Sequence, residues 1–269
     1  WLAPLPVLLL APHVRRRWAA LAGFAAYALG GLNQWTYLHG YIGLPMTTIV
    51  PAIAGPGLML ALCTLLFRRL LVRDRPVAAA LAVPALWVTI EYINTQFSPH
   101  GTFGSIAYTQ MDALPVLQLA AVTGLWGIGF LLLLVPAALA VLAAPRMSTR
   151  GRATVATIAL VLLVAALGFG AWRLQVPATG QVRVGLVSLE KPIRPALHDA
   201  DGQALETRYV AAIDRLAAVG AQIVVIPETV FATGDATVPA FAAAAQRDRL
   251  ILDAGIDAKG DPRAERNMA

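Results

Sequence analysis

The sequence ATVATIALVLLVAALGFGAW, residues 153–172, contains 20 residues and no charged side chain. A helix needs about 20 apolar residues to cross the hydrocarbon core of a bilayer, which is roughly 30 Å thick. This stretch therefore predicts a helix that spans a membrane. Apolar stretches also occupy residues 18–33, 45–67, 76–93 and 116–144.

An apolar run at residues 1–12 is too short to span, and no basic segment precedes it as in a signal peptide. The sequence thus predicts a membrane α-helical bundle of about six spans, the first of them incomplete. The stretch 116–144 is longer than one span needs, so we expect its ends to lie in the interface or the helix to bend at Pro136.

The composition divides the chain into two parts. Overall, 58% of the residues are hydrophobic and 13% are charged, whereas soluble domains carry about 25% charged residues. Residues 1–175 hold 11 arginines and three acidic residues, but residues 176–269 hold 10 basic and 12 acidic residues. Because the positive charge lies in short loops between apolar stretches, the sequence predicts a membrane domain at 1–175, a soluble domain at 176–269, and no nucleic-acid partner.

Charge alternates between successive loops of the membrane domain. Residues 13–17, 68–75 and 145–152 are rich in arginine, and residues 34–44 and 94–115 contain no Lys or Arg. Basic loops stay in the cytoplasm. The pattern predicts a multi-pass protein in which everything after Arg173, including the soluble domain, lies outside the cytoplasm.

The two neutral loops are rich in aromatic side chains. One interpretation is an aromatic belt at the membrane surface, and the other is a lipid-facing entrance to an active site. The side chains concerned are Trp35, Tyr37, Tyr41, Phe97, Phe103 and Tyr108.

Histidine and cysteine give no sign of a metal site or a disulfide. The four histidines are scattered without the spacing of metal ligands, and Cys63 is the one cysteine. We expect no metal and no cofactor.

The soluble part alternates apolar runs with amphipathic segments. Residues 182–187, 222–226 and 250–256 are predicted strands. The first two flank a helix with Asp201 as a candidate N-cap and Gly220 at its end, and a second helix opens near Pro239. The order β-α-β-α-β predicts an α/β sheet with helices on its face. We expect the IVVI run at 223–226 to be a strand that is buried on both faces.

Glu228 directly follows Pro227, just past the end of the IVVI strand. Ligands bind at the carboxyl ends of strands in α/β sheets. A carboxylate that is partly desolvated there can act as a general base. The alternative is an ordinary loop acid, or a residue that helps to cap the next element.

Two longer stretches resemble a known family. VRVGLVS (182–188) and QIVVIPETVF (222–231) resemble the opening of the nitrilase, or carbon–nitrogen hydrolase, superfamily. The segment from 85 to 130 resembles the apolipoprotein N-acyltransferases, which have an acid in a helix, then a Tyr-x-Gln, then a Gly-x-Trp-Gly helix start. The matching positions are Glu91, Tyr108, Gln110, Gly124 and Gly127.

The resemblance implies an acyltransferase of the bacterial inner membrane. It implies an α-β-β-α sandwich on the periplasmic side and a Glu–Lys–Cys triad, with Glu228 as the general base. The cysteine would take an acyl chain from a phospholipid donor as a thioester and pass it to a diacylated lipoprotein acceptor. Lys191, Lys259 and Cys63 do not match the other two triad positions. We therefore expect a truncated chain that is inactive by itself.

Some positions depart from the family pattern. Glu91-Tyr92-Ile93-Asn94 stands where the family has acid-aromatic-x-Arg, and Gly101-Thr102-Phe103-Gly104 stands where it has Gly-Phe-Pro-Trp. These departures leave two alternatives open: a membrane-anchored nitrilase-like amidase or hydrolase, and a non-enzymatic protein with a degenerate nitrilase domain. An acid in a span indicates function by default, but Glu91 could also extend to the interface. Gly124, Gly127 and Gly129 are most simply explained as close-packing positions between helices.

Overall fold

The structure is a computed structural model that describes residues 1–98, 101–145, 147–177, 179–190, 195–227, 230–234, 237–258 and 267–268. The chain forms two compact units, Trp1–Val176 and Pro177–Ala269. Each unit is described by itself.

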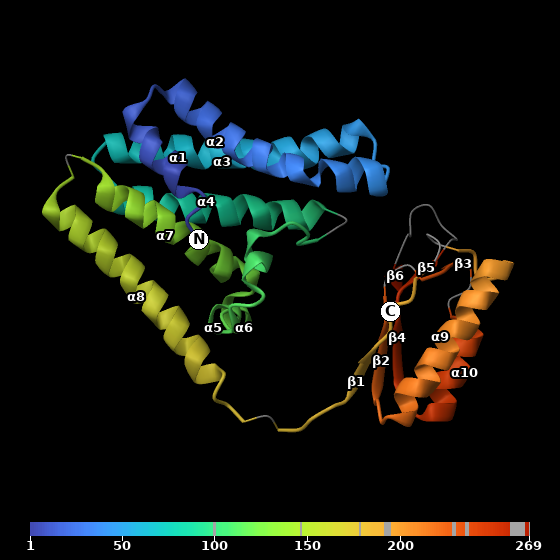
Figure 1. Ribbon diagram of the computed structural model, residues 1–269. Coiled ribbons are helices and arrows are strands. Elements are labelled where there is room, and N and C mark those ends of the chain that lie inside the picture. Colours follow the sequence, from blue (N-terminus) through green and yellow to red (C-terminus); the bar gives the residue numbers. More distant parts are fainter. Residues whose placement is uncertain are drawn as a thin grey trace. The chain divides into compact units, whose positions relative to one another are not determined.

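The first unit is helical (Figure 1). Short helical segments extend or link its main helices at Ala11–His13, Leu32–Gln34, Thr36–Tyr41 and Ile106–Gln110. Its α-helices are α1 (Leu5–Leu10), α2 (Arg16–Gly31), α3 (Met46–Val72), α4 (Pro76–Phe97), α5 (Leu114–Leu117), α6 (Ala120–Thr123), α7 (Leu125–Ala143) and α8 (Thr149–Arg173).

Among the described residues, four helices are long and apolar enough to cross a membrane, namely α3, α4, α7 and α8. This is fewer than the six spans expected from the sequence. Helix α2 has 16 residues and continues into the distorted turns that end at Tyr41, while α1 has six residues. A membrane helical bundle is thus the architecture of the first unit.

Small residues let α2 and α3 approach each other closely. A Cβ on Gly23 would lie 3.0 Å from the Ala61 Cα, and a Cβ on Gly57 would lie 3.1 Å from the Phe24 carbonyl oxygen. Small residues at such contacts are typical of helices packed within membranes, where dispersion contacts replace the hydrophobic effect between helices.

The long apolar stretch 116–144 is broken at Gly124. We expected either ends that lie in the interface or a bend at Pro136. Gly124 has φ +61° and ψ −161°, a backbone conformation that is essentially restricted to glycine. Pro136 lies inside the continuous helix α7. Glycine is thus required at position 124 by its backbone angles rather than by close packing between helices.

The three arginine-rich loops lie at one end of the first unit. The Arg68 guanidinium donates to the Val14 carbonyl at 2.9 Å, and a Cβ on Gly151 would lie 2.9 Å from Pro76 Cγ. Figure 1 shows the α1–α2, α3–α4 and α7–α8 links at this same end. The helices therefore run back and forth in the way that the charge alternation predicts.

The second unit is an α/β fold with two small sheets. Strands β1, β2 and β4 form a parallel sheet with β2 in the centre, and β5 pairs parallel with β3 and antiparallel with β6. The elements are β1 (Val184–Leu186), α9 (Ala200–Ala218), β2 (Ile223–Ile226), β3 (Ala232–Thr233), α10 (Pro239–Asp248), β4 (Ile251–Ala254), β5 (Ile256–Ala258) and β6 (Asn267–Met268). Asp199, not Asp201, occupies the N-cap position of α9, and Asp201 lies in its first turn.

Helices α9 and α10 cover one face of the parallel sheet, as Figure 1 also shows. Gly185 pairs with Val224, and a Cβ on Gly185 would lie 2.7 Å from the Leu216 side chain of α9. The rings of Tyr209, Phe231 and Phe241 pack together in this core, with centroids 5.8 to 6.4 Å apart.

The opposite face of this sheet is open, and it carries five apolar side chains together with Asp253 of β4. Side chains alternate between the two faces of a strand, so Val184, Leu186 and Ile251 share this face, with exposed fractions of 49%, 76% and 65%. In β2, Val224 and Ile226 are buried but Ile223 and Val225 are half-buried. The IVVI strand is thus fully covered on one face only, which corrects the expectation of burial on both.

Candidate functional site

The catalytic residue predicted from the sequence, Glu228, lies outside the described residues, as do Lys191 and Lys259. The structure describes the residues on either side of Glu228. Pro227 follows the central strand β2, and the buried Val230 donates its N–H to the Gly255 carbonyl at 2.9 Å. The role of Glu228 stays a prediction.

Cys63, the one cysteine of the chain, lies in the middle of α3. Its side chain is fully buried, and the nearest hydrogen-bond acceptor to its Sγ is the Val83 carbonyl, at 3.7 Å. Among the described residues, this thiol has a backbone carbonyl and no basic side chain as its hydrogen-bond partner, and it is closed off from solvent.

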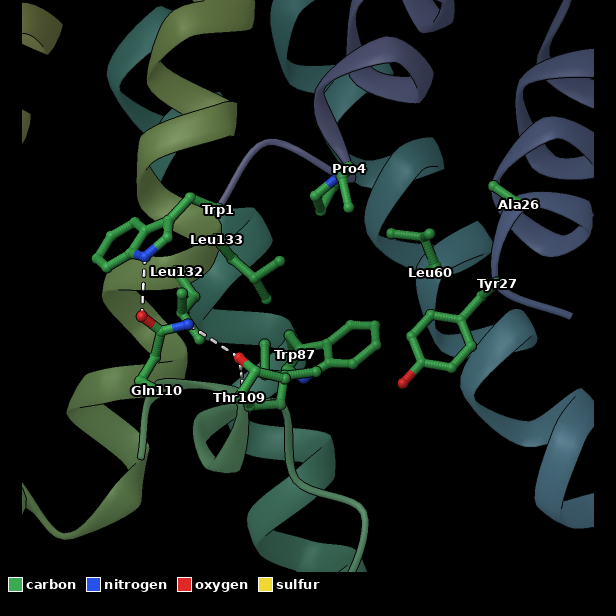
Figure 2. Close-up of a pocket in the computed structure, with 12 residues that line it drawn as sticks. Trp1, Pro4, Ala26, Tyr27, Leu60, Trp87, Thr109, Gln110, Leu132 and Leu133 are labelled. Carbon is green, nitrogen blue, oxygen red and sulfur yellow. Dashed lines mark hydrogen bonds between the residues drawn. The ribbon is translucent and has the colours of Figure 1, made fainter. Parts of the chain in front are cut away.

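The first unit contains a cavity of about 370 Å³. This size lies within the range of about 300–1,000 Å³ that small-molecule sites usually have. Apolar side chains from several helices form most of its wall. Its polar atoms include those of Thr109, Gln110 and the Tyr27 hydroxyl. The residues drawn in Figure 2 are Trp1, Ala3, Pro4, Ala26, Tyr27, Leu60, Trp87, Ile106, Thr109, Gln110, Leu132 and Leu133.

A chain of hydrogen bonds fixes the polar edge of the cavity. The Trp1 indole donates to Gln110 Oε1 at 2.8 Å, and Gln110 Nε2 donates to Thr109 Oγ1 at 3.0 Å, as the dashed lines of Figure 2 show. Thr109 in turn donates to the Ile106 carbonyl at 2.7 Å. Gln110, from the Tyr-x-Gln motif, therefore holds the turn Ile106–Gln110 against the cavity.

Tyr108 of the same motif points elsewhere. Its phenol oxygen lies 2.6 Å from Thr102 Oγ1, and the side chain is 47% exposed. The two residues of the motif thus have separate roles: Gln110 lines the cavity and Tyr108 ties down the preceding loop.

Glu91 lies beneath this turn. Its Oε1 accepts the Ile106 backbone N–H at 3.3 Å, and its Oε2 is buried without a hydrogen bond. A buried oxygen without a partner costs about 1–3 kcal/mol. The carboxylate therefore does not extend into open solvent, and the Ser105 and Trp87 side chains are hydrogen-bond donors close to it.

Trp87 precedes Glu91 by one helical turn and lines the cavity. Its indole Nε1 is buried without a partner of good geometry, and its ring packs on Tyr27 at 5.6 Å between centroids. Gly129 of α7 faces the same group, since a Cβ there would lie 3.8 Å from Glu91 Oε2. One side of α4 thus carries a donor and an acceptor that lie close to each other next to the cavity.

The aromatic side chains of the neutral loops are at least 38% exposed. The highest values are 83% for Phe97, 79% for Phe103 and 77% for Tyr41. Tyr92 of α4, just before the second neutral loop, is 50% exposed, and its ring lies edge-on against Trp126 at 5.5 Å between centroids. The exposed aromatics fit both a membrane-surface belt and an entrance, so both interpretations stay open.

Sequence reasoning missed the cavity itself. Trp1 and Gln110 are 109 residues apart in the chain, and no local pattern predicts such a pair. The available signal was an ionisable Glu91 and a Trp87 spaced one turn apart in an otherwise apolar stretch.

Comparisons with known proteins agree on one family. A family model described as the apolipoprotein N-acyltransferase N-terminal domain matches residues 1–139, which is more than half of the chain. A protein of Geobacter metallireducens named apolipoprotein N-acyltransferase is 30% identical over 191 residues, covering 67% of this chain and 36% of that protein. A protein of the same name from Azotobacter vinelandii is 32% identical over 180 residues, covering 61% and 33%. The chain thus spans about a third of the length of these relatives.

Proposed function

Because the chain belongs to the apolipoprotein N-acyltransferase family, we propose that the complete protein transfers an acyl chain from a phospholipid to a lipoprotein. The acceptor is the N-terminal amine of a diacylglyceryl-cysteine. The observation that carries this proposal is the match of the membrane unit to the family over residues 1–139.

The proposed chemistry runs through a cysteine thioester. Glu228 takes the proton of the cysteine thiol, and the thiolate attacks the acyl ester of the phospholipid and releases a lysophospholipid that takes up the proton. The lipoprotein amine then attacks the thioester, forms an amide and frees the thiol. A thiolate is a strong nucleophile near neutral pH and splits one difficult transfer into two easier steps. A lysine would stabilise the oxyanion in both steps.

The second unit is proposed to be part of a nitrilase-like domain. Its parallel sheet carries helices on one face and exposed apolar side chains on the other, including Val184, Leu186 and Ile251. An apolar face of this kind is normally covered in a folded protein. A second sheet packed there would complete an α-β-β-α sandwich.

The cavity of the membrane unit is proposed to hold a lipid acyl chain. Its walls are mostly apolar, with Thr109 and Gln110 at one edge and the Tyr27 hydroxyl as a further polar group. A chain with an apolar tail and a polar ester end matches this distribution. Glu91 and Trp87, which lie close to each other next to the cavity, suit the polar end of such a ligand.

The orientation is part of the proposal. The arginine-rich end of the first unit faces the cytoplasm of a bacterium. The second unit lies on the periplasmic side of the inner membrane. The support is the gathering of three arginine-rich loops at one end of the bundle, together with the tendency of basic loops to stay inside.

The function is tested by mass spectrometry of lipoprotein N-termini. The complete protein is expressed in a strain depleted of its own apolipoprotein N-acyltransferase. We expect a third acyl chain on the N-terminal cysteine. Lipoproteins that stay diacylated, despite membrane insertion of the protein, would favour the amidase alternative.

A further inference from the structure

The arginine-rich end of the membrane unit carries positive charge with almost no compensation. One acidic residue, Asp74, lies in its three loops. Among the described residues, no salt bridge involves an arginine of this end. We call these residues the arginine end: Arg15, Arg16, Arg17, Arg68, Arg69, Arg73, Arg75, Arg150 and Arg152.

Helix termini add no net charge to this end. Helices α2, α4 and α8 begin at the arginine end, and α1, α3 and α7 end there. A helix N-terminus carries about half a positive charge and a C-terminus about half a negative charge. The positive charge of this end therefore comes from its arginines.

The beginnings of α4 and α8 are in direct contact. A Cβ on Gly151 would lie 2.9 Å from Pro76 Cγ. Arg75 therefore lies beside Arg150 and Arg152 along the two backbones. We call these three residues the arginine triad.

Arg152 has an unused hydrogen-bond donor. Its Nη2 donates to the Ala144 carbonyl at 2.7 Å, which anchors the side chain. Its Nε is buried and has no partner. Arg75 and Arg150 are exposed, so their guanidinium groups are open to a ligand.

Helix α8 offers an apolar surface next to the triad. Most of its apolar side chains are exposed, and Leu160, Val161 and Val164 are more than half exposed. A molecule with an anionic head at the triad can thus lay an apolar chain along α8.

We propose that the arginine triad binds the phosphate of an anionic phospholipid in the adjacent leaflet. Guanidinium groups bind phosphate oxygens in pairs, and basic clusters at the ends of membrane helices attract anionic lipids. The lipid is favoured over a soluble anion because the triad lies where the spans end and where headgroup phosphates are concentrated. The site is at the opposite end of the unit from the neutral loops and does not depend on acyl transfer.

Lipid titration of the purified 269-residue chain in neutral detergent tests the proposal, with native mass spectrometry as the readout. We expect phosphatidylglycerol to bind more tightly than phosphatidylcholine. Each arginine near a membrane surface strengthens such binding about fivefold, so the variant Arg75→Gln/Arg150→Gln/Arg152→Gln should bind phosphatidylglycerol about 100-fold more weakly.

A matched variant removes the same charge elsewhere. Arg208, Arg215 and Arg249 are exposed residues of the second unit, and their combined replacement by Gln should change binding less than about twofold. Circular dichroism verifies the helix content of both variants. Three results would each overturn the proposal: equal binding of the two lipids, phosphatidylglycerol binding to the arginine-triad variant that equals wild-type binding, or full displacement of the lipid by inorganic phosphate.

The wild-type chain alone also gives a decisive result if the triad variant does not fold. Binding of phosphatidylglycerol should weaken as salt rises from about 0.05 M to about 0.5 M, because salt screens exposed charges. Binding that is independent of salt would overturn the proposal.

Discussion

Replacing Gly170 by alanine should loosen the contact between α8 and α5. A Cβ at this position would lie 1.8 Å from the Pro115 carbonyl oxygen and 2.6 Å from its carbonyl carbon. Both atoms belong to backbone, which cannot turn aside as a side chain can. Helix α8 would therefore have to move away by about 1 Å in a close-packed interior.

The expected loss is set by two opposing effects. Overpacking of this kind costs about 1–3 kcal/mol, and alanine recovers up to about 1 kcal/mol through its higher helix propensity. Gly168 is the matched control, because it lies in the same helix and a Cβ there would meet nothing within 4 Å. Gly168→Ala gains the propensity without the clash.

The assay is thermal unfolding of both variants and the wild type in the same detergent, followed by circular dichroism. Gly170→Ala is therefore about 1–3 kcal/mol less stable than Gly168→Ala, which for a unit of this size corresponds to a Tm that is lower by about 2–12 °C. We expect this difference between the two variants and no fall for Gly168→Ala relative to the wild type. Equal melting temperatures for the two variants would refute the reasoning about the α5–α8 contact.

Three further predictions concern topology, activity and the second unit. Alkaline phosphatase fused after Gln175 should be active and the same fusion after Arg150 inactive, because the enzyme works only outside the cytoplasm; the reverse pattern would contradict the orientation. The 269-residue chain, assayed with phospholipid and a diacylated lipopeptide, should show no acyl transfer, since no Lys or Cys in it matches the Glu–Lys–Cys triad of the family. Turnover above background would mean that the assignment of this catalytic triad is wrong. Phe231→Ala, in the core of the second unit, should lower the free energy of unfolding of that unit by about 3–5 kcal/mol, while Leu186→Ala on the open sheet face should cost much less; similar losses in urea unfolding would mean that the two faces are equally covered.

Length and hydropathy predicted the long helices well. The apolar stretches 76–93 and 153–172 correspond to α4 (Pro76–Phe97) and α8 (Thr149–Arg173). In these segments the apolar length and the flanking arginines or proline are local features. The sequence therefore contains most of the information that places these helices.

The break at Gly124 could not be predicted in this way. A glycine in an apolar stretch is equally compatible with a helix, a packing contact or a turn. The choice depends on the contacts of the flanking segments, such as Tyr92 with Trp126. These contacts form only when α4 and α7 pack together.

The candidate site was predicted in part. The motif residues Glu91 and Gln110 lie at or next to the cavity, but the partners Ile106 and Trp1 come from distant parts of the sequence. Such pairs follow from how the helices pack rather than from local pattern. The degree of cover on the IVVI strand likewise depends on what packs against each face of the sheet, which its own four residues do not specify.

The central claim is tested most directly by acyl-thioester formation in the complete protein with Glu228→Gln. Gln matches Glu in shape and still forms hydrogen bonds, but it cannot take the thiol proton. Loss of a general base lowers rates by about 10²–10⁴-fold. With radiolabelled phospholipid and a quenched time course, we predict that the variant inserts into the membrane normally and forms the thioester about 10²-fold or more slowly than wild type. Thioester formation at the wild-type rate would contradict the assignment of Glu228 as the base and, with it, the nitrilase-like mechanism.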